Sequence, residues 1–295
     1  MERPTSKRGE PGGPQSAGDT SAARTSEAST EERNPRAAAL ASLSTRQLLE
    51  LMNDEDATVP GAVRDAIPEI ERAVEMVADA LSKGGRLRYV GAGTSGRLGV
   101  LDASEAQPTF GVEPELVHAI MAGGDQALRR SVEGAEDDAD AGARDARAVV
   151  RSGDVLVGIS ASGRARYVIA AVAAARVVAA HTVAITCDPA SPLAGAAEVA
   201  VVLRVGPEVL AGSSRLKAGT ATKLALNMIS TAAMVKLGKT KGDLMIDMRP
   251  VNAKLRERAI RIVRDETGLD AEEAGRRLEA SGWDVRAVLE SSEQR

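Results

Sequence analysis

The chain has 295 residues, of which 43% are hydrophobic, with a net charge of -4 and a pI of about 5.5. This length allows one large domain, alone or with a small appendage, and the apolar fraction is sufficient for a sizeable core. The acidic balance provides no basic surface for nucleic acid or an anionic membrane, and one Phe, one Trp and two Tyr residues argue against base stacking. One Cys and two His residues argue against disulfide frameworks and against Cys-rich or His-rich metal sites.

The N-terminus is polar. Residues 1–36 are rich in Gly, Ser, Thr, Pro, Glu and Arg and contain almost no large apolar residues. Such a segment cannot bury enough surface to offset its ordering entropy, so we predict a disordered tail, with a partner-binding arm as the alternative. The start of the chain lacks the apolar core of a signal peptide, and no apolar run is long enough to span a bilayer. We therefore expect a cytoplasmic protein.

Two helices are predicted next. Residues 44–52 (STRQLLELM) have the pattern of a capped helix. In residues 60–83, apolar side chains recur at spacings of three and four, which predicts one amphipathic helix. Gly84 and Gly85 are expected to end it.

Short β-rich segments then alternate with helical ones. Strands are predicted at 87–90, within 154–164, at 181–186 and at 198–205; helices are predicted from near Ser95, at 166–180 and at 215–237. Such alternation is typical of a parallel sheet covered by helices on both faces. The fold class expected is therefore α/β, a three-layer parallel sheet.

The composition changes after Arg249-Pro250. Residues 253–293 predict three short helices with breaks at Gly268 and Gly282. The domain organisation expected is thus a tail (1–36), a sheet domain with N-terminal helices (37–250) and a small helical C-terminal domain (251–295).

Two predicted strand–helix junctions are rich in Gly, Ser and Thr: GAGTSGR (91–97) and SASGR (160–164). Glycine allows close approach of a ligand, and a helix start offers unpaired N–H groups to an anion. Both loops would lie at the carboxyl ends of strands, where α/β proteins bind ligands. Ordinary βα turns are the alternative; no Walker A lysine follows, and the acidic residue of a dinucleotide site is missing. The candidate ligand residues are Gly93, Thr94, Ser95, Ser160, Ser162 and Gly163.

Longer strings carry a specific resemblance. The paired loops resemble the SIS (sugar isomerase) domain, a flavodoxin-like fold that binds phosphosugars. Residues 89–111, 122–138 (AGGDQALRRSVEGAEDD), 206–223 (GPEVLAGSSRLKAGTATK) and 226–239 are similar to the N-acetylmuramic acid 6-phosphate etherase family. The resemblance covers roughly residues 40–290 in order, and the C-terminal helices resemble a UBA-like three-helix fold.

The resemblance implies cleavage of the lactyl ether of N-acetylmuramic acid 6-phosphate, by elimination and water addition, to N-acetylglucosamine 6-phosphate and D-lactate. This chemistry needs a base for the C2 proton and an acid for the leaving oxygen, and two positioned carboxyl groups could supply both. The carboxyls at the matching positions are Glu105, as proton donor to lactate, and Glu136, as base, in competition with the neighbouring Glu133, Asp137 and Asp138. A solvated helix face is the alternative for Glu105. No metal or organic cofactor is implied.

The same resemblance suggests that Glu208 contacts sugar hydroxyls and that Lys217 faces the sugar or its phosphate; a structural Glu and a helix-start Lys are the alternatives. This chain departs from the family at Ala165, where a Thr is usual, so a phosphate-facing hydroxyl is expected to be missing.

The partners expected are a small-molecule sugar phosphate and a second copy of the chain. SIS proteins are typically homodimers with sites completed by both subunits, whereas nucleic acid and membranes are not expected as partners. Two other functions remain open: an aldose–ketose isomerase on the same fold, and a sugar-phosphate-sensing regulatory SIS protein.

Overall fold

The computed structural model describes residues 30–293; residues 1–29 and 294–295 lie outside it. The predicted disordered tail therefore falls mostly outside the described residues. Its last part, residues 30–36, makes defined contacts: Asn34 is buried and donates a hydrogen bond to the Glu55 carboxylate at 2.9 Å. These residues are held by polar contacts and not by burial of apolar side chains. A composition that lacks apolar residues therefore did not distinguish them from the tail.

Five parallel strands form one sheet in the order β2-β1-β3-β4-β5. Their bounds are Leu87–Gly91 (β1), Val117–Met121 (β2), Val155–Ile159 (β3), His181–Thr186 (β4) and Val199–Val202 (β5). The parallel α/β sheet predicted from the sequence is confirmed. The sequence did not identify β2, because its residues VHAIM lie at the sheet edge and mix a polar, exposed His118 with small apolar side chains.

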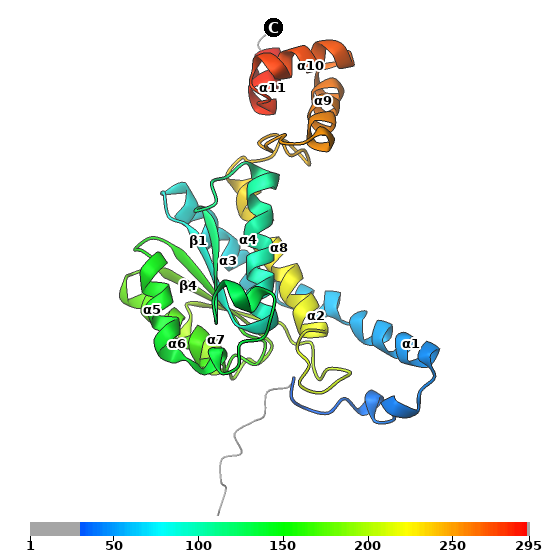
Figure 1. Ribbon diagram of the computed structural model, residues 1–295, viewed down its shortest axis with the longest axis vertical. Helices are drawn as coiled ribbons and strands as arrows, with labels where there is room; N and C mark the ends of the chain where they lie inside the picture. The colour runs from blue at the N-terminus through cyan, green and yellow to red at the C-terminus, as the bar shows by residue number, and fades with distance from the viewer. Residues whose placement is uncertain (1–29, 294–295) are drawn as a thin grey trace, which may run out of the picture.

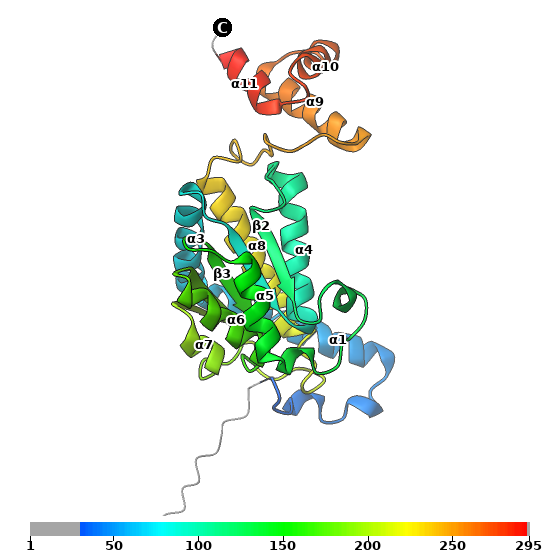
Figure 2. The same ribbon diagram turned by 60° about the vertical axis from the view of Figure 1, so that its left-hand side comes forward.

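Helices cover both faces of the sheet (Figures 1 and 2), which gives the three layers expected. One apolar core lies between the sheet and α2 (Val59–Asp65), α3 (Ile67–Ser82), α4 (Gly93–Phe110) and α8 (Lys217–Lys236). A second core lies between the other face and α5 (Ala139–Val149), α6 (Arg166–Val177) and α7 (Pro192–Ala196).

The single helix predicted at 60–83 is two helices, so that prediction was wrong at one point. α2 ends at Asp65 and α3 begins at Ile67, with Ala66 between them at φ -92° and ψ 3°. Pro68 lies in the first turn of α3, where the missing N–H of proline is tolerated. In the middle of one longer helix the same proline would interrupt the hydrogen bonding. The apolar spacing is continuous across the break because both helices pack on the same core.

Short helices precede this pair. Helical turns at Pro35–Ala37 (η1) and Leu40–Ser42 (η2) lead to α1 (Thr45–Asp56), which confirms the capped helix predicted at 44–52. Ser44 and Gln47 form a reciprocal capping box at its start. Figure 1 shows α1 standing out from the rest of the molecule.

The C-terminal residues form the three predicted helices, α9 (Ala253–Thr267), α10 (Ala271–Ala280) and α11 (Val285–Glu293). Together with Ile246 and Met248 of the preceding segment they form a small apolar core, in which Val263, Leu278 and Val285 are fully inaccessible to solvent. Gly268 ends α9 in the left-handed conformation at φ +74°. In Figure 1 these helices lie beyond the C-terminal end of α4.

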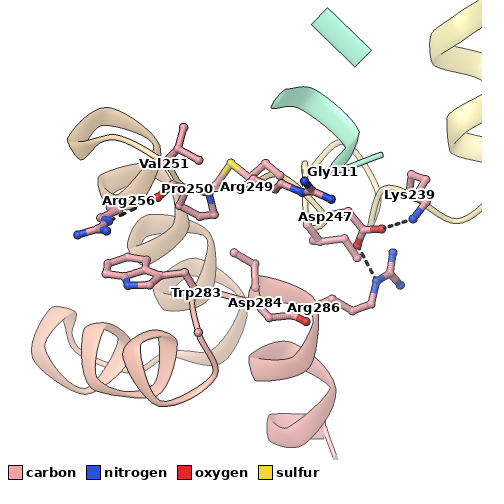
Figure 3. Close-up of a pocket in the computed structure, with 14 residues that line it drawn as sticks. Gly111, Lys239, Asp247, Arg249, Pro250, Val251, Arg256, Trp283, Asp284 and Arg286 are labelled. Atoms are coloured by element: carbon pink, nitrogen blue, oxygen red, sulfur yellow. Dashed lines mark hydrogen bonds and ion pairs between the residues drawn. The ribbon is translucent and has the colours of Figure 1, made fainter. Parts of the chain in front are cut away.

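Asp247 joins these helices to the sheet region (Figure 3). Its carboxylate accepts from Lys239 Nζ at 3.0 Å and from Arg286 Nε, on α11, at 2.7 Å. Burial pushes the pKa of Asp247 upward, but the two cations together hold it below its ordinary value. The backbone also fits closely here, since a Cβ on Gly111 would lie 2.0 Å from the Asp247 carbonyl oxygen.

Replacing Asp247 by Ala is expected to loosen this joint, because two cations would lose a common partner. A hydrogen bond to a charged group contributes about 1.5–3 kcal/mol to stability, and less where solvent screens it. We therefore expect the free energy of unfolding to fall by about 1–3 kcal/mol. Hydrogen exchange of residues 239–252 should accelerate, while Asp243→Ala, which removes an exposed carboxylate from the same loop, should have little effect. Equal exchange rates in the two variants would refute the claim that Asp247 holds the C-terminal helices to the sheet region.

Candidate active site

The strand order reverses between β1 and β3, and in open α/β sheets ligands bind at the carboxyl ends of strands beside such a reversal. A pocket of about 240 Å³ lies there. We call it the switch-point pocket. Its lining residues are Thr30, Glu31, Ala92, Gly93, Thr94, Ser95, Glu136, Ile159, Ser160, Ala161, Ser162, Ala165, Gly212 and Ser214.

The loop after β1 brings the start of α4 to this pocket. α4 begins at Gly93, which has a φ of +54°, and the preceding Ala92 provides no side-chain cap. The first N–H groups of the helix are therefore free of a side-chain acceptor at the point where Thr94 and Ser95 line the pocket. Such an arrangement suits an anion.

The loop after β3 is held by its own serines. Ser160 Oγ accepts from the Gly163 N–H at 3.1 Å, and Ser162 Oγ accepts from the Arg164 N–H at 3.3 Å. Gly163 does not line the pocket but shapes the loop: its φ is +65°, and a Cβ would lie 2.2 Å from Ser191 Oγ. Ser160 and Ser162 thus line the pocket on a firmly positioned turn.

Ala165 lies where the sequence departs from the family pattern. It precedes α6, lines the switch-point pocket and provides no side-chain cap to that helix. This side of the pocket therefore has a methyl group where a threonine would place a hydroxyl.

Glu136 lines the switch-point pocket from the turn η4 (Ala135–Asp137). It also lines an adjoining hollow of about 230 Å³, which contains Arg130 and Ser131. Glu136 therefore lies at the boundary between the hydroxyl-rich pocket and a hollow that carries a guanidinium group.

The other acidic residues of this segment are placed differently. Glu133 lines only the adjoining hollow, and neither Asp137 nor Asp138 lines either cavity. Asp138 instead caps α5, where it accepts from the Ala141 N–H at 2.8 Å. Among the four carboxylates that the sequence left in competition, only Glu136 lines the pocket that both Gly/Ser/Thr loops share.

Glu105 is not brought to the pocket within one chain. It is exposed on α4, twelve residues after Gly93, which corresponds to about 18 Å along the helix. The helix is firmly oriented, because the buried Asp102 accepts from Tyr89 Oη and from Asn227 Nδ2, both at 2.7 Å. Glu105 therefore projects from a fixed helix into solvent.

Glu208 and Lys217 have protein partners and do not line the pocket. Glu208 is fully buried and accepts from the N–H groups of Lys217 at 3.0 Å and Ala218 at 2.9 Å, which caps α8. Burial raises the pKa of Glu208 despite these hydrogen bonds and the nearby ammonium group. Lys217 Nζ lies 2.6 Å from the Glu55 carboxylate, and both side chains are buried. Within one chain, the contacts of Glu208 and Lys217 are therefore those of a structural glutamate and a helix-start lysine, the two alternatives to ligand roles.

Several residues that line the pocket were given no role from the sequence. Thr30 and Glu31 belong to a stretch that composition marks as a tail, and Gly212 and Ser214 belong to the loop before α8. Composition and periodicity provide no signal for them, since only the folded chain brings residue 30 to residue 212.

Within residues 30–293, no group of three or more His, Cys, Asp or Glu side chains is arranged to hold a metal ion. No helix in this range is both long and apolar enough to cross a membrane. A cavity of about 700 Å³ lies at the Asp247 joint, where the Arg256 guanidinium lies over the Trp283 ring (Figure 3). None of the Gly/Ser/Thr loop residues lines this cavity.

The chain matches two family models. Residues 69–176 match the N-terminal SIS domain of glucokinase regulatory protein, and residues 135–233 match the SIS domain. Among solved structures, the phosphoheptose isomerase from Neisseria gonorrhoeae aligns with a TM-score of 0.50 at 22% identity, over 64% of this chain and 98% of that one. This likeness supports the SIS fold.

Curated proteins are much more similar. The N-acetylmuramic acid 6-phosphate etherase of Symbiobacterium thermophilum is 50% identical over 260 residues, covering 88% of this chain and 87% of that protein. Proteins of the same name from Aeromonas hydrophila and Yersinia pestis are 52% and 51% identical, over 84% and 88% of this chain and the same shares of their own lengths. With such identity along nearly the whole of each protein, the chain belongs to the N-acetylmuramic acid 6-phosphate etherase family.

Proposed function

We propose that the protein cleaves the D-lactyl ether of N-acetylmuramic acid 6-phosphate to N-acetylglucosamine 6-phosphate and D-lactate, in the recycling of peptidoglycan amino sugars. The observation that carries this proposal is the position of Glu136, which lines the same pocket as the hydroxyl-rich loops. A phosphosugar held by these loops would have a carboxylate beside it. The names of the relatives at about 50% identity agree with this assignment.

The reaction we propose is an elimination followed by an addition, a carbon–oxygen lyase reaction in its first half. Glu136 removes the proton at C2 of the open-chain sugar, the C3–O bond breaks, and the lactate oxygen takes a proton from a carboxylic acid. Water then adds at C3 and C2 regains a proton, which gives N-acetylglucosamine 6-phosphate. General acid–base catalysis of this kind typically contributes about 10²–10⁴-fold for each group.

The adjoining hollow suits the lactyl group. The substrate carries a carboxylate on its lactyl arm, and Arg130 lines the adjoining hollow but not the switch-point pocket. A guanidinium group forms strong, charge-assisted hydrogen bonds with a carboxylate. With the phosphate at the loops, Glu136 would face the sugar carbons between the two anionic groups.

We propose that the acid is Glu105 of a second copy of the chain, in a homodimer. α4 exposes Leu101 beside Glu105, and α8, which packs against α4, exposes Met228 and Val235. α1 projects from the molecule with Leu49 60% exposed. Exposed apolar side chains on these helices favour association, and an interface that covers α4 would bury Glu105 against the partner.

The test of the proposed function is D-lactate release. Purified full-length protein incubated with N-acetylmuramic acid 6-phosphate should release D-lactate, detected with a D-lactate dehydrogenase. The same sugar without its phosphate should react far more slowly, because the loops would have no anion to hold. Folded protein that releases no D-lactate from the phosphorylated sugar would overturn the proposal.

Two other functions have less support. The match to the glucokinase regulatory protein SIS domain favours a sugar-phosphate sensor as the second candidate, which would bind a sugar phosphate and release no lactate. An aldose–ketose isomerase would convert the sugar phosphate without cleaving the ether. The lactate assay, run beside a binding measurement and a ketose assay, separates the three.

A further inference from the structure

Thr30 is part of the wall of the switch-point pocket. Its side chain is 1% exposed, and its carbonyl oxygen accepts from the Gly212 N–H at 2.9 Å. The same pocket is lined by the hydroxyl-bearing residues of both phosphosugar loops, among them Thr94 and Ser162. A residue outside the sheet thus adds a hydroxyl-bearing side chain to the lining of this pocket.

The hydroxyl of Thr30 has no hydrogen-bond partner among the described residues. Its Oγ1 is buried, and within residues 30–293 one other buried side-chain atom, Arg88 Nε, also lacks a hydrogen-bond partner. Buried polar side chains almost always have a partner, because leaving one unsatisfied costs about 1–3 kcal/mol. An unpaired hydroxyl in the wall of a polar pocket is therefore a donor available to whatever the pocket holds.

The segment that carries Thr30 is firmly anchored. Asn34 Nδ2 donates to Glu55 at 2.9 Å and to the Pro207 carbonyl at 3.3 Å, and Arg36 Nη1 donates to the other Glu55 oxygen at 2.9 Å. Glu55 in turn is paired with the buried Lys217. This network fixes residues 30–36 against α1 and the start of α8, so Thr30 is positioned before any ligand arrives.

The position of Thr30 complements Ala165. The loop after β3 lacks a hydroxyl at Ala165, and Thr30 lines the same pocket from a different segment. The free N–H groups at the starts of α4 and α6 favour an anion in this pocket, and a hydroxyl donor adds one more hydrogen bond to it. Glu31 and Glu136 also line the pocket and would repel a phosphoryl group, so donors such as Thr30 matter more.

We propose that Thr30 donates a hydrogen bond to the phosphoryl group of the bound sugar phosphate, so that the start of the anchored segment 30–36 forms part of the substrate site. This inference rests on the proposed function for the identity of the sugar. It assigns to the N-terminal segment a direct role in affinity.

Three variants of the full chain test the proposal. Thr30→Val keeps the shape of the side chain and removes the donor, Thr30→Ser keeps the donor, and Thr45→Val removes an exposed hydroxyl on α1, outside the pocket. We expect the Kd of N-acetylglucosamine 6-phosphate, measured by calorimetry, to rise about 10- to 100-fold in Thr30→Val, since a hydrogen bond to a charged group is lost. Thr30→Ser and Thr45→Val should stay close to the unaltered protein.

Inorganic phosphate, used as a competitor, identifies the atom group contacted. If Thr30 contacts the phosphoryl group, Thr30→Val also weakens competition by phosphate. Unchanged binding of both ligands would overturn the proposal, and so would weaker sugar-phosphate binding with unchanged phosphate competition, which would place the contact on the sugar. Failure of the proposed function is distinct, because it would appear as absent lactate release in the unaltered protein while these binding results still decide the role of Thr30.

Discussion

Replacing Glu136 by Gln should lower the rate of D-lactate release by about 10²–10⁴-fold, the usual contribution of a general base. The amide keeps the size of the side chain and cannot take the C2 proton. Because Glu136 is exposed on a surface turn, the variant should fold normally and bind N-acetylglucosamine 6-phosphate with little change. The effect should therefore fall on kcat rather than on binding.

The matched control is Asp137→Asn, in the same turn but outside both cavities. It should retain activity. Exchange of the C2 proton with deuterated water, followed by NMR, provides an independent measure of the base. A Glu136→Gln protein that still exchanges this proton at the original rate would refute Glu136 as the base, and a large loss in Asp137→Asn would move the role to its neighbour.

A mixture of two inactive variants tests where Glu105 acts. If Glu105 serves the pocket of the partner, Glu105→Ala and Glu136→Gln refolded together should regain activity. Each heterodimer then has one pocket with an intact Glu136 and an intact Glu105 from the other chain. If both residues serve the same chain, no heterodimer has a complete pocket and the mixture stays inactive.

Replacing Glu55 by Ala should be the most destabilising of these substitutions, at about 3–5 kcal/mol, because it leaves a buried ammonium group without its partner. The side chains of Glu55 and Lys217 are 8% and 4% exposed, and their charged atoms lie 2.6 Å apart. Urea unfolding of the full chain measures the loss. The second change Lys217→Met should recover much of it, since both charges are then absent.

Glu50→Ala on the same helix is the control. Glu50 is paired with Arg46, but both side chains are exposed, and such pairs contribute about 0–1 kcal/mol. If Glu55→Ala cost no more than Glu50→Ala, the buried pair would not stabilise the fold.

The same pair makes stability depend on pH. Burial pushes the pKa of Glu55 upward, but its hydrogen bond to Lys217 and the nearby cations bring it below the ordinary value of 4.5. A carboxylate with a lowered folded-state pKa stabilises the protein above its unfolded-state pKa and loses that contribution as pH falls through the folded-state value. The stability difference between the protein and Glu55→Gln should therefore shrink below pH 4.5.

The strands and long helices could be predicted because each carries its own signal. β3 is a short apolar run buried on both faces, and the predicted helix at 215–237 agrees closely with α8. β2 carries no such signal, because an edge strand need not be apolar throughout. Pro68 marks the break between α2 and α3, yet periodicity alone runs across it.

The site was predictable in part for the same reason. The Gly/Ser/Thr loops are local patterns, and topology alone brings them together at β1 and β3. The contact of Thr30 with the pocket and the ion pair of Glu55 with Lys217 join distant parts of the chain, the ion pair across 162 positions, so no local sequence pattern predicts them. The partners of Glu208 and Lys217 could not be predicted for the same reason, since folding brings them together.

Trp283 is the single tryptophan of the sequence, and it lies at the Asp247 joint with the Arg256 guanidinium 4.8 Å from its ring centre. The pocket and this joint lie near opposite ends of α8, whose 20 residues span about 30 Å. The protein thus carries a single tryptophan fluorophore, placed far from the switch-point pocket. A change in tryptophan emission on adding a sugar phosphate would report a change at this joint without any label.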